Sequence, residues 1–180
     1  LVAAAALDGE GVVGMAYNAS LLVLRADEPG SCTANDGDAD LEGCQFFDSD
    51  IARGIDIAIA ARARVINLSL GGGKPSSPFT NAVRRATQAG IVVVVAAGND
   101  GDTTDPALDP NNPDPFAIAT LGQGNGAVII VGSVDDSGQF SDFSNRAGDY
   151  ADGFLSARGE RICCVYENGE IQVTEQNGQS

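Results

Sequence analysis

The segment Ile91-Val92-Val93-Val94-Val95-Ala96-Ala97-Gly98-Asn99-Asp100 decides the fold. Its β-branched start is too apolar for a strand with one face in water, which predicts a central strand of a parallel sheet covered by helices on both faces. The small residues that follow let a ligand backbone approach, and ligands of such sheets bind at the carboxyl ends of strands. Asn99 would offer two N–H donors there. Gly-Asn-Asp-Gly is also ordinary turn chemistry, so this segment alone leaves a plain turn open.

A second segment has the same character, because Val65-Ile66-Asn67-Leu68-Ser69 is a short β-rich run that ends in three glycines. Apolar residues at helical spacing predict helices over 50–63, capped by Asp48 or Ser49, and over 77–90, with Ser77 as N-cap and Gly90 as the stop. The inner face of the second helix is expected to comprise Phe79, Ala82, Val83, Ala86 and Ala89. Strands alternating with helices at these lengths predict an α/β fold with a mainly parallel, three-layer arrangement.

Other elements follow from the same patterns. Residues 1–7 predict a helix already under way, and 20–25 and 127–134 predict strands. The long Pro- and Asp-rich loop 100–125 is expected to carry a short helix around 115–120. Alternating residues in 162–165 and 171–175 predict a hairpin around Asn168-Gly169.

The two strand segments, the helix between them and their order resemble the subtilisin-like serine proteases, or subtilases. The matching segments are V-I-N-L-S-L-G-G and V-V-V-V-A-A-G-N. Residues 11–19 are similar to the family's G-V-x-G-V-A-P, with Tyr17 in place of Pro. Residues 131–135 and 140–145 are similar to V-G-A-V-D and F-S-N. The resemblance covers most of the chain, with two insertions, and the insertions are similar to those of exported bacterial subtilases, some of them autotransporter passengers.

The resemblance implies roles for seven residues. Asn99 would be the oxyanion-hole donor, which stabilises charge that develops on the scissile carbonyl. The backbone of Ser69, Leu70 and Gly71 would pair with an extended peptide, and Ala96, Ala97 and Gly98 would form the other wall of the specificity pocket. Asp100 is expected either near the mouth of this pocket, attracting a basic residue, or as a solvated loop acid.

The catalytic triad is expected outside these 180 residues. The chain contains no histidine, and Leu1-Val2-Ala3 is similar to the tail of the family's H-G-T-x-V-A motif. The nucleophile's G-T-S motif is expected beyond Ser180. The resemblance therefore implies that residues 1–180 are the central part of a peptidase domain, truncated at both ends and inert alone.

Composition limits the partners. The net charge of −15 and pI near 4.1 argue against nucleic acid, because phosphate binding needs clustered Lys and Arg. No segment approaches the roughly 20 apolar residues of a membrane helix. The expected partner is a peptide or protein substrate, with no cofactor for the chemistry. Without an initial Met or a leader, the chain is expected to be a piece of something longer.

The acidic insertion 27–47 is bracketed by Cys32 and Cys44. This arrangement predicts a disulfide and an exported protein, secreted or at the cell surface, with two free thiols as the alternative. Cys163 and Cys164 are expected to be buried small side chains, and zinc is not expected. Alternating acids in the insertion leave structural calcium and a solvated loop both open, although Leu41 stands where an EF-hand needs Gly. These acids are Asp36, Asp38, Asp40 and Glu42.

The combined prediction is the central portion of a secreted serine endopeptidase. One alternative is a peptide-binding relative that has lost its triad. The other is a phosphate-binding α/β domain, because Gly71-Gly72-Gly73-Lys74 precedes a helix. The Walker spacing is not met, and Pro75 follows the lysine where Ser or Thr would bind magnesium.

Overall fold

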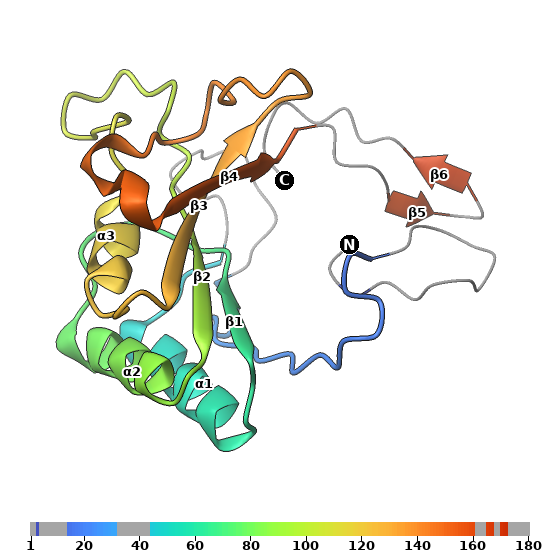
Figure 1. Ribbon diagram of the computed structural model, residues 1–180, viewed down its shortest axis with the longest axis vertical. Coiled ribbons are helices and arrows are strands. Elements are labelled where there is room, and N and C mark those ends of the chain that lie inside the picture. Colours follow the sequence, from blue (N-terminus) through green and yellow to red (C-terminus); the bar gives the residue numbers. More distant parts are fainter. Residues whose placement is uncertain (1–2, 4–13, 32–43, 161–164, 168–169, 173–180) are drawn as a thin grey trace.

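A computed structural model describes residues 3, 14–31, 44–160, 165–167 and 170–172 (Figure 1). Its main sheet has four parallel strands in the order β1-β2-β3-β4. In-register pairs such as Val65↔Val92 and Val93↔Val128 join neighbouring strands. The sheet confirms the predicted α/β class. The strands are β1 (Val65–Leu68), β2 (Val92–Ala96), β3 (Val128–Val134) and β4 (Phe154–Arg158).

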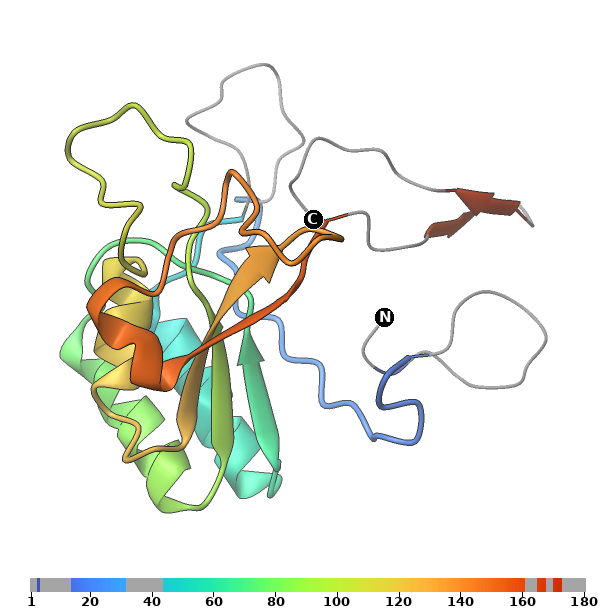
Figure 2. The same cartoon turned by 45° about the horizontal axis from the view of Figure 1, so that its top comes forward.

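In the part of the chain that the structure describes, the α-helices cover one face of this sheet (Figures 1 and 2). They are α1 (Asp48–Ala60), α2 (Ser77–Gln88) and α3 (Pro115–Leu121). Val93, Val95 and Ile130 alternate onto this face and are buried in one core with the helices. Val92 and Val94 point to the opposite face and are half-buried. The part of the chain that the structure describes thus gives β2 one helix-covered face, where the apolar run predicted two.

The helix α2 supplies the centre of the core. Phe79 is 0% exposed, and its ring centroid lies 4.5 Å from that of Phe116 in α3. Ala89 was expected on the inner face but is exposed, because the helix ends at Gln88. Gly90 follows with φ +79, a left-handed conformation that glycine adopts without a Cβ penalty. The other buried residues of this face are Ala82, Val83 and Ala86.

Both predicted helix caps are wrong. The N-cap of α1 is Phe47, and that of α2 is Ser76; neither side chain makes a capping hydrogen bond. Asp48 instead accepts from the Ser76 backbone N–H at 2.5 Å. A carboxylate in the first turn of α1 still suits the positive end of the helix dipole.

The strand predicted at 20–25 is also wrong. Residues 21–26 have no strand assignment, and Leu21 and Val23 are 65% and 84% exposed. Within the described ranges β1 pairs with β2 alone, so this segment gains no backbone partner to hold it as a strand. An isolated bridge from Asp27 to Phe46 follows it.

The carboxyl-terminal part begins with a 3₁₀ helix, η2 (Gly148–Gly153), ahead of β4. An antiparallel pair, β5 (Val165–Glu167) and β6 (Glu170–Gln172), confirms the predicted hairpin with different bounds. Several predictions lie outside the described residues. These are the helix at 1–7, the motif at 11–13, Cys32, the four acids of the insertion, Cys163 and Cys164.

Candidate active site

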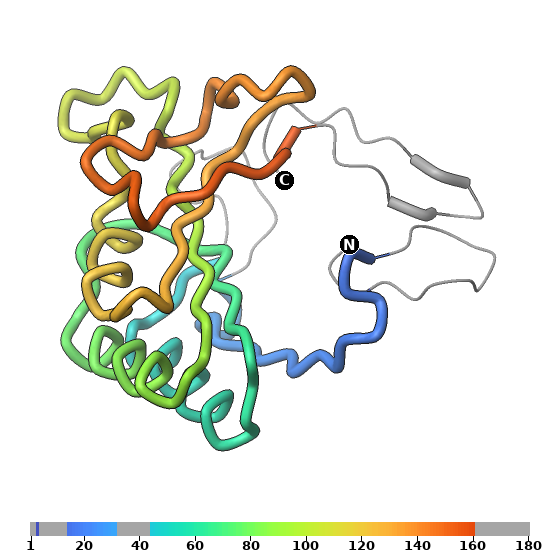
Figure 3. Tube along the Cα trace, in the orientation of Figure 1, coloured from blue at the N-terminus to red at the C-terminus, as the bar shows by residue number. Residues whose placement is uncertain are grey.

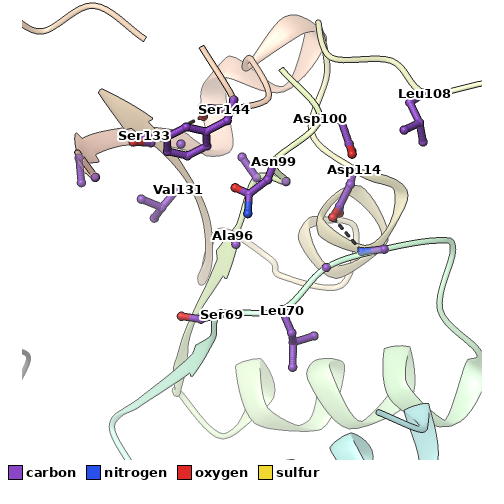
Figure 4. Close-up of a pocket in the computed structure, with 18 of the residues that line it drawn as sticks. Ser69, Leu70, Ala96, Asn99, Asp100, Leu108, Asp114, Val131, Ser133 and Ser144 are labelled. Carbon is purple, nitrogen blue, oxygen red and sulfur yellow. Dashed lines mark hydrogen bonds between the residues drawn. The ribbon is translucent and has the colours of Figure 1, made fainter. Parts of the chain in front are cut away.

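A cavity of about 610 Å³ lies where β1, β2 and β3 end (Figure 4). The loop 100–114 leaves β2 at this edge of the sheet (Figure 3). Its residues Asp100, Leu108 and Asp114 line the cavity. The structure brings all seven residues of the predicted site to this cavity. They are Ser69, Leu70, Gly71, Ala96, Ala97, Gly98 and Asn99.

Asn99 stands at the carboxyl end of β2 with an exposed side chain. Figure 4 shows its amide among the side chains that line the cavity. No described residue makes a hydrogen bond with this amide. Gly98 before it has φ +111, so the chain turns sharply at the end of the strand. The Asn99 amide is therefore available to a ligand in the cavity.

The loop after β1 is held by Asp114, the N-cap residue of α3. One carboxylate oxygen accepts from the Gly72 backbone N–H at 2.9 Å, and the other accepts from Ala117 at 2.8 Å. The Asp114 backbone N–H donates to the Ala97 carbonyl at 2.8 Å. A Cβ on Gly71 would collide with the carboxylate. One residue thus ties together the loops that follow β1 and β2.

The cavity carries negative charge. Asp114 is 6% exposed, and burial raises its pKa above the ordinary value, with a further rise from the charge of Asp100. The Asp100 carboxylate is half-buried and also lines the cavity. Arg158 lies at the rim, but its guanidinium is paired with Asp136 at 2.5 Å. The lining therefore favours a cationic or neutral ligand group over an anion.

Comparison with known proteins shows to which family the chain belongs. A model of the subtilase family (peptidase S8) matches residues 1–179. The chain belongs to the subtilase family.

Individual subtilases align with most of the chain. It is 36% identical over 148 residues to a thermophilic serine proteinase of Bacillus sp. (strain AK1), covering 81% of the chain and 29% of that protein. It is 31% identical over 158 residues to the major intracellular serine protease of Bacillus subtilis (strain 168), covering 88% and 42%. A solved protease from Pseudoalteromonas arctica PAMC 21717 superposes with a TM-score of 0.61 and 34% identity, covering 88% and 41%. The chain spans less than half the length of each.

The serine hydroxyls beside this subtilase cavity form hydrogen bonds within the protein. Ser144 Oγ accepts from the Ser133 backbone N–H at 2.9 Å, and Ser133 Oγ lies 2.6 Å from Ser141 Oγ. A serine nucleophile needs an adjacent general base, and the sequence contains no histidine. Among the described residues, the serines of the cavity therefore have no neighbouring histidine to act as general base.

Two residues of the site were missed by the sequence patterns. Asp114 precedes a proline at the start of a short helix, and this Asp-Pro step is an N-cap signal that could have been recognised. Its contact with Gly72 spans 42 residues and has no local signal. Asn145, the last residue of the F-S-N match, is 1% exposed and contacts Asp100 from 45 residues away.

The described residues were also compared with the predictions on metal binding and membrane insertion. Among them, no three His, Cys, Asp or Glu side chains lie close enough to hold a metal ion. The calcium alternative concerns acids outside those residues. None of the described helices combines the length and apolar character needed to cross a bilayer.

Proposed function

We propose that the whole protein to which this chain belongs is a serine endopeptidase that hydrolyses peptide bonds by acyl transfer. The observation that carries the proposal is the exposed amide of Asn99 at the end of β2, which has no hydrogen-bond partner among the described residues and lies on a cavity edged by a glycine-rich loop. An amide fixed on a strand end can donate where charge develops on the substrate carbonyl. The main chain of Ser69, Leu70 and Gly71 makes no loop hydrogen bond within the part of the chain that the structure describes, which suits it to pair with an extended peptide.

The nucleophile and the general base are proposed to come from outside this chain. Without histidine, residues 1–180 supply substrate binding and oxyanion stabilisation, and are expected to be inert alone. Acyl transfer begins with attack by a nucleophile, so groups that only stabilise charge cannot carry out its first step.

The test compares the whole protein with the 180-residue chain. The whole protein is expected to hydrolyse a chromogenic peptide and to be labelled on one serine by a serine-directed phosphonate. The chain alone is expected to do neither. Labelling of a serine within the chain would contradict the proposed location of the triad, and a whole protein that binds peptides without turnover would indicate a non-catalytic relative.

The phosphate-binding alternative is disfavoured by Asp114. Its carboxylate already accepts from the Gly72 backbone N–H, which is a donor that a phosphate in the glycine loop would need. A second anion there would meet like-charge repulsion. Inorganic phosphate is accordingly expected not to raise the melting temperature at millimolar concentrations.

The proposal includes export and a bridge between Cys32 and Cys44. It rests on the acidic insertion that these cysteines bracket, because such pairs are typical of proteins that fold in oxidising compartments. One relative is intracellular by name, so location needs its own experiment. Mass spectrometry of a non-reduced digest is expected to yield the linked pair, and two free thiols after aerobic refolding would contradict both the bridge and export.

A further inference from the structure

Asn145 is a buried amide that contacts three separate parts of the chain. It is 1% exposed. Its backbone N–H donates to the Gly98 carbonyl at 3.1 Å. Its side-chain Oδ1 accepts from the Asp100 backbone N–H at 2.7 Å, and its Nδ2 donates to the Asn112 carbonyl at 3.1 Å.

The first two of these bonds fall on either side of Asn99. The Gly98 carbonyl belongs to the peptide unit before Asn99, and the Asp100 N–H belongs to the one after it. The two peptide units that set the direction of the Asn99 side chain are thus tied to one residue. The third bond, to Asn112, prevents the Asn145 amide from rotating away from Asp100, because rotation would leave a buried donor unsatisfied.

The packing around these bonds leaves little freedom. A Cβ on Gly98 would lie 2.9–3.0 Å from side-chain atoms of Asn145, so the strand end and the amide are in direct contact. The Gly101 N–H donates to the Phe143 carbonyl at 2.7 Å, which continues the same contact one residue further along. Groups that stabilise a transition state are most effective when they are held in place before the reaction.

We propose that Asn145 is the positioning residue that holds Asn99 in the orientation for donation to the oxyanion. The proposal rests on the proposed peptidase function of the same site. Asn145 acts through the main chain at Gly98 and Asp100 and does not touch the substrate. Because its amide does not titrate, this positioning is expected to be the same at every pH at which the protein is folded.

The test is a double-mutant cycle in the whole protein. Asn145→Ala is expected to lower kcat about tenfold or more while KM changes less than about threefold, because the loss concerns a group that acts in the transition state. In the Asn99→Ala background, Asn145→Ala is expected to have almost no further effect on kcat, because the donor it positions is already absent. Effects that multiply, or an unchanged kcat in an active enzyme, would overturn the proposal.

The matched control is Thr120→Val. Thr120 is also fully buried, and its hydroxyl donates to the Phe116 carbonyl inside α3 at 2.8 Å, away from Asn99. This variant is expected to lower the melting temperature and to leave kcat unchanged. If Asn145→Ala fails to fold, Asn145→Ser replaces it, since a hydroxyl is too short to reach both Asp100 and Asn112, and the same kcat result is expected.

Amide hydrogen exchange tests the positioning without activity. In Asn145→Ala or Asn145→Ser, exchange at the Asp100 N–H is expected to accelerate at least about tenfold under native conditions, because the Asn145 amide oxygen that accepts from it is gone. Thr120→Val is expected not to change it. Unchanged protection of Asp100 in both Asn145 variants would overturn the positioning, whereas absent peptide hydrolysis by the wild type would overturn the peptidase proposal alone.

Discussion

The loops that follow β1 and β2 line the same cavity, and each is held by a side chain far along the sequence. Asp114 holds the first through Gly72, and Asn145 holds the second through Asp100. The first side chain is a buried carboxylate that can take up a proton, and the second is an amide that cannot. The loop proposed to pair with the peptide and the loop proposed to carry the oxyanion donor are therefore expected to differ in how they respond to pH and to substitution.

The largest expected effect is that of Asn99→Ala, which distinguishes an oxyanion donor in the loop after β2 from a plain turn residue. Asn99→Ala is expected to lower kcat by about 10²–10³-fold with KM nearly unchanged, a magnitude that comes from the oxyanion asparagine of a subtilisin. The melting temperature is expected to change little, because the side chain is exposed and has no described hydrogen-bond partner. Kinetics and a melting curve on the whole protein check both.

Asn125→Ala is the matched control for that prediction. Asn125 is exposed in the turn before β3 and has φ +43, a conformation that asparagine tolerates better than alanine. This variant is expected to lose stability and to keep kcat. The same pattern in Asn99→Ala would identify Asn99 as a turn residue.

Disturbing the first loop is expected to affect substrate binding more than turnover. In Gly71→Ala the new methyl group would displace the Asp114 carboxylate from Gly72. A hydrogen bond to a charged group contributes about 1.5–3 kcal/mol, so a KM about tenfold higher with a smaller change in kcat is expected. Gly122→Ala is the control, because a Cβ there makes ordinary 3.6 Å contacts. A kcat loss larger than the KM rise would mean that the two loops share one role.

The pH dependence of stability is a third way to test the comparison. Burial raises the pKa of Asp114 in the folded protein, so its contribution to the free energy of unfolding is fully present below pH 3.8 and is lost as pH rises through the raised pKa. The stability of the wild type relative to Asp114→Asn is therefore expected to fall with rising pH. Urea unfolding of both proteins across the acid range measures this.

Asp135 supplies the opposite sign as a control. Hydrogen bonds, first from the Ser137 side chain, lower its pKa, so its contribution is present above pH 3.8 and is lost as pH falls. The stability of the wild type relative to Asp135→Asn is expected to rise with pH. If Asp114 gave the same trend as Asp135, its carboxylate would be stabilised as the anion, and the contrast between the two loops would disappear.

The smallest expected effect concerns the charge of Asp100. Its half-buried carboxylate lines the cavity, and none of the described ion pairs includes it. Asp100→Asn is expected to raise KM about two- to fivefold for peptides with Lys or Arg beside the scissile bond, with the difference shrinking in high salt. Peptides with Leu at that position serve as the control. An equal change for both peptides would assign Asp100 to main-chain structure.

The sequence predicted the structure well where apolar residues form runs or recur at a regular spacing. The β-branched runs predicted β1 and β2, and the apolar spacing predicted the inner face of α2 apart from Ala89. Strand order then follows from the crossovers, which is why the seven site residues meet at one cavity.

Sequence patterns failed where the determining partner is distant or absent. Residues 20–25 have the composition of a strand, but strand structure depends on a neighbour that composition does not reveal. The contacts of Asp114 with Gly72 and of Asn145 with Asp100 span 42 and 45 residues, beyond the range of any periodic signal. The residues that hold the site were therefore harder to recognise than the residues that line it.

The exposed edge of β1 has a consequence for handling the 180-residue chain. Val65 in β1 is 58% exposed, and within the described residues this strand is paired on one side only. Open strand edges with apolar side chains promote aggregation between copies. The net charge of −15 opposes such contact, but its repulsion reaches only about 10 Å at 0.1 M salt. Low-salt buffer above the pI is therefore expected to keep the chain dispersed during purification, and raising the salt concentration is expected to promote its aggregation.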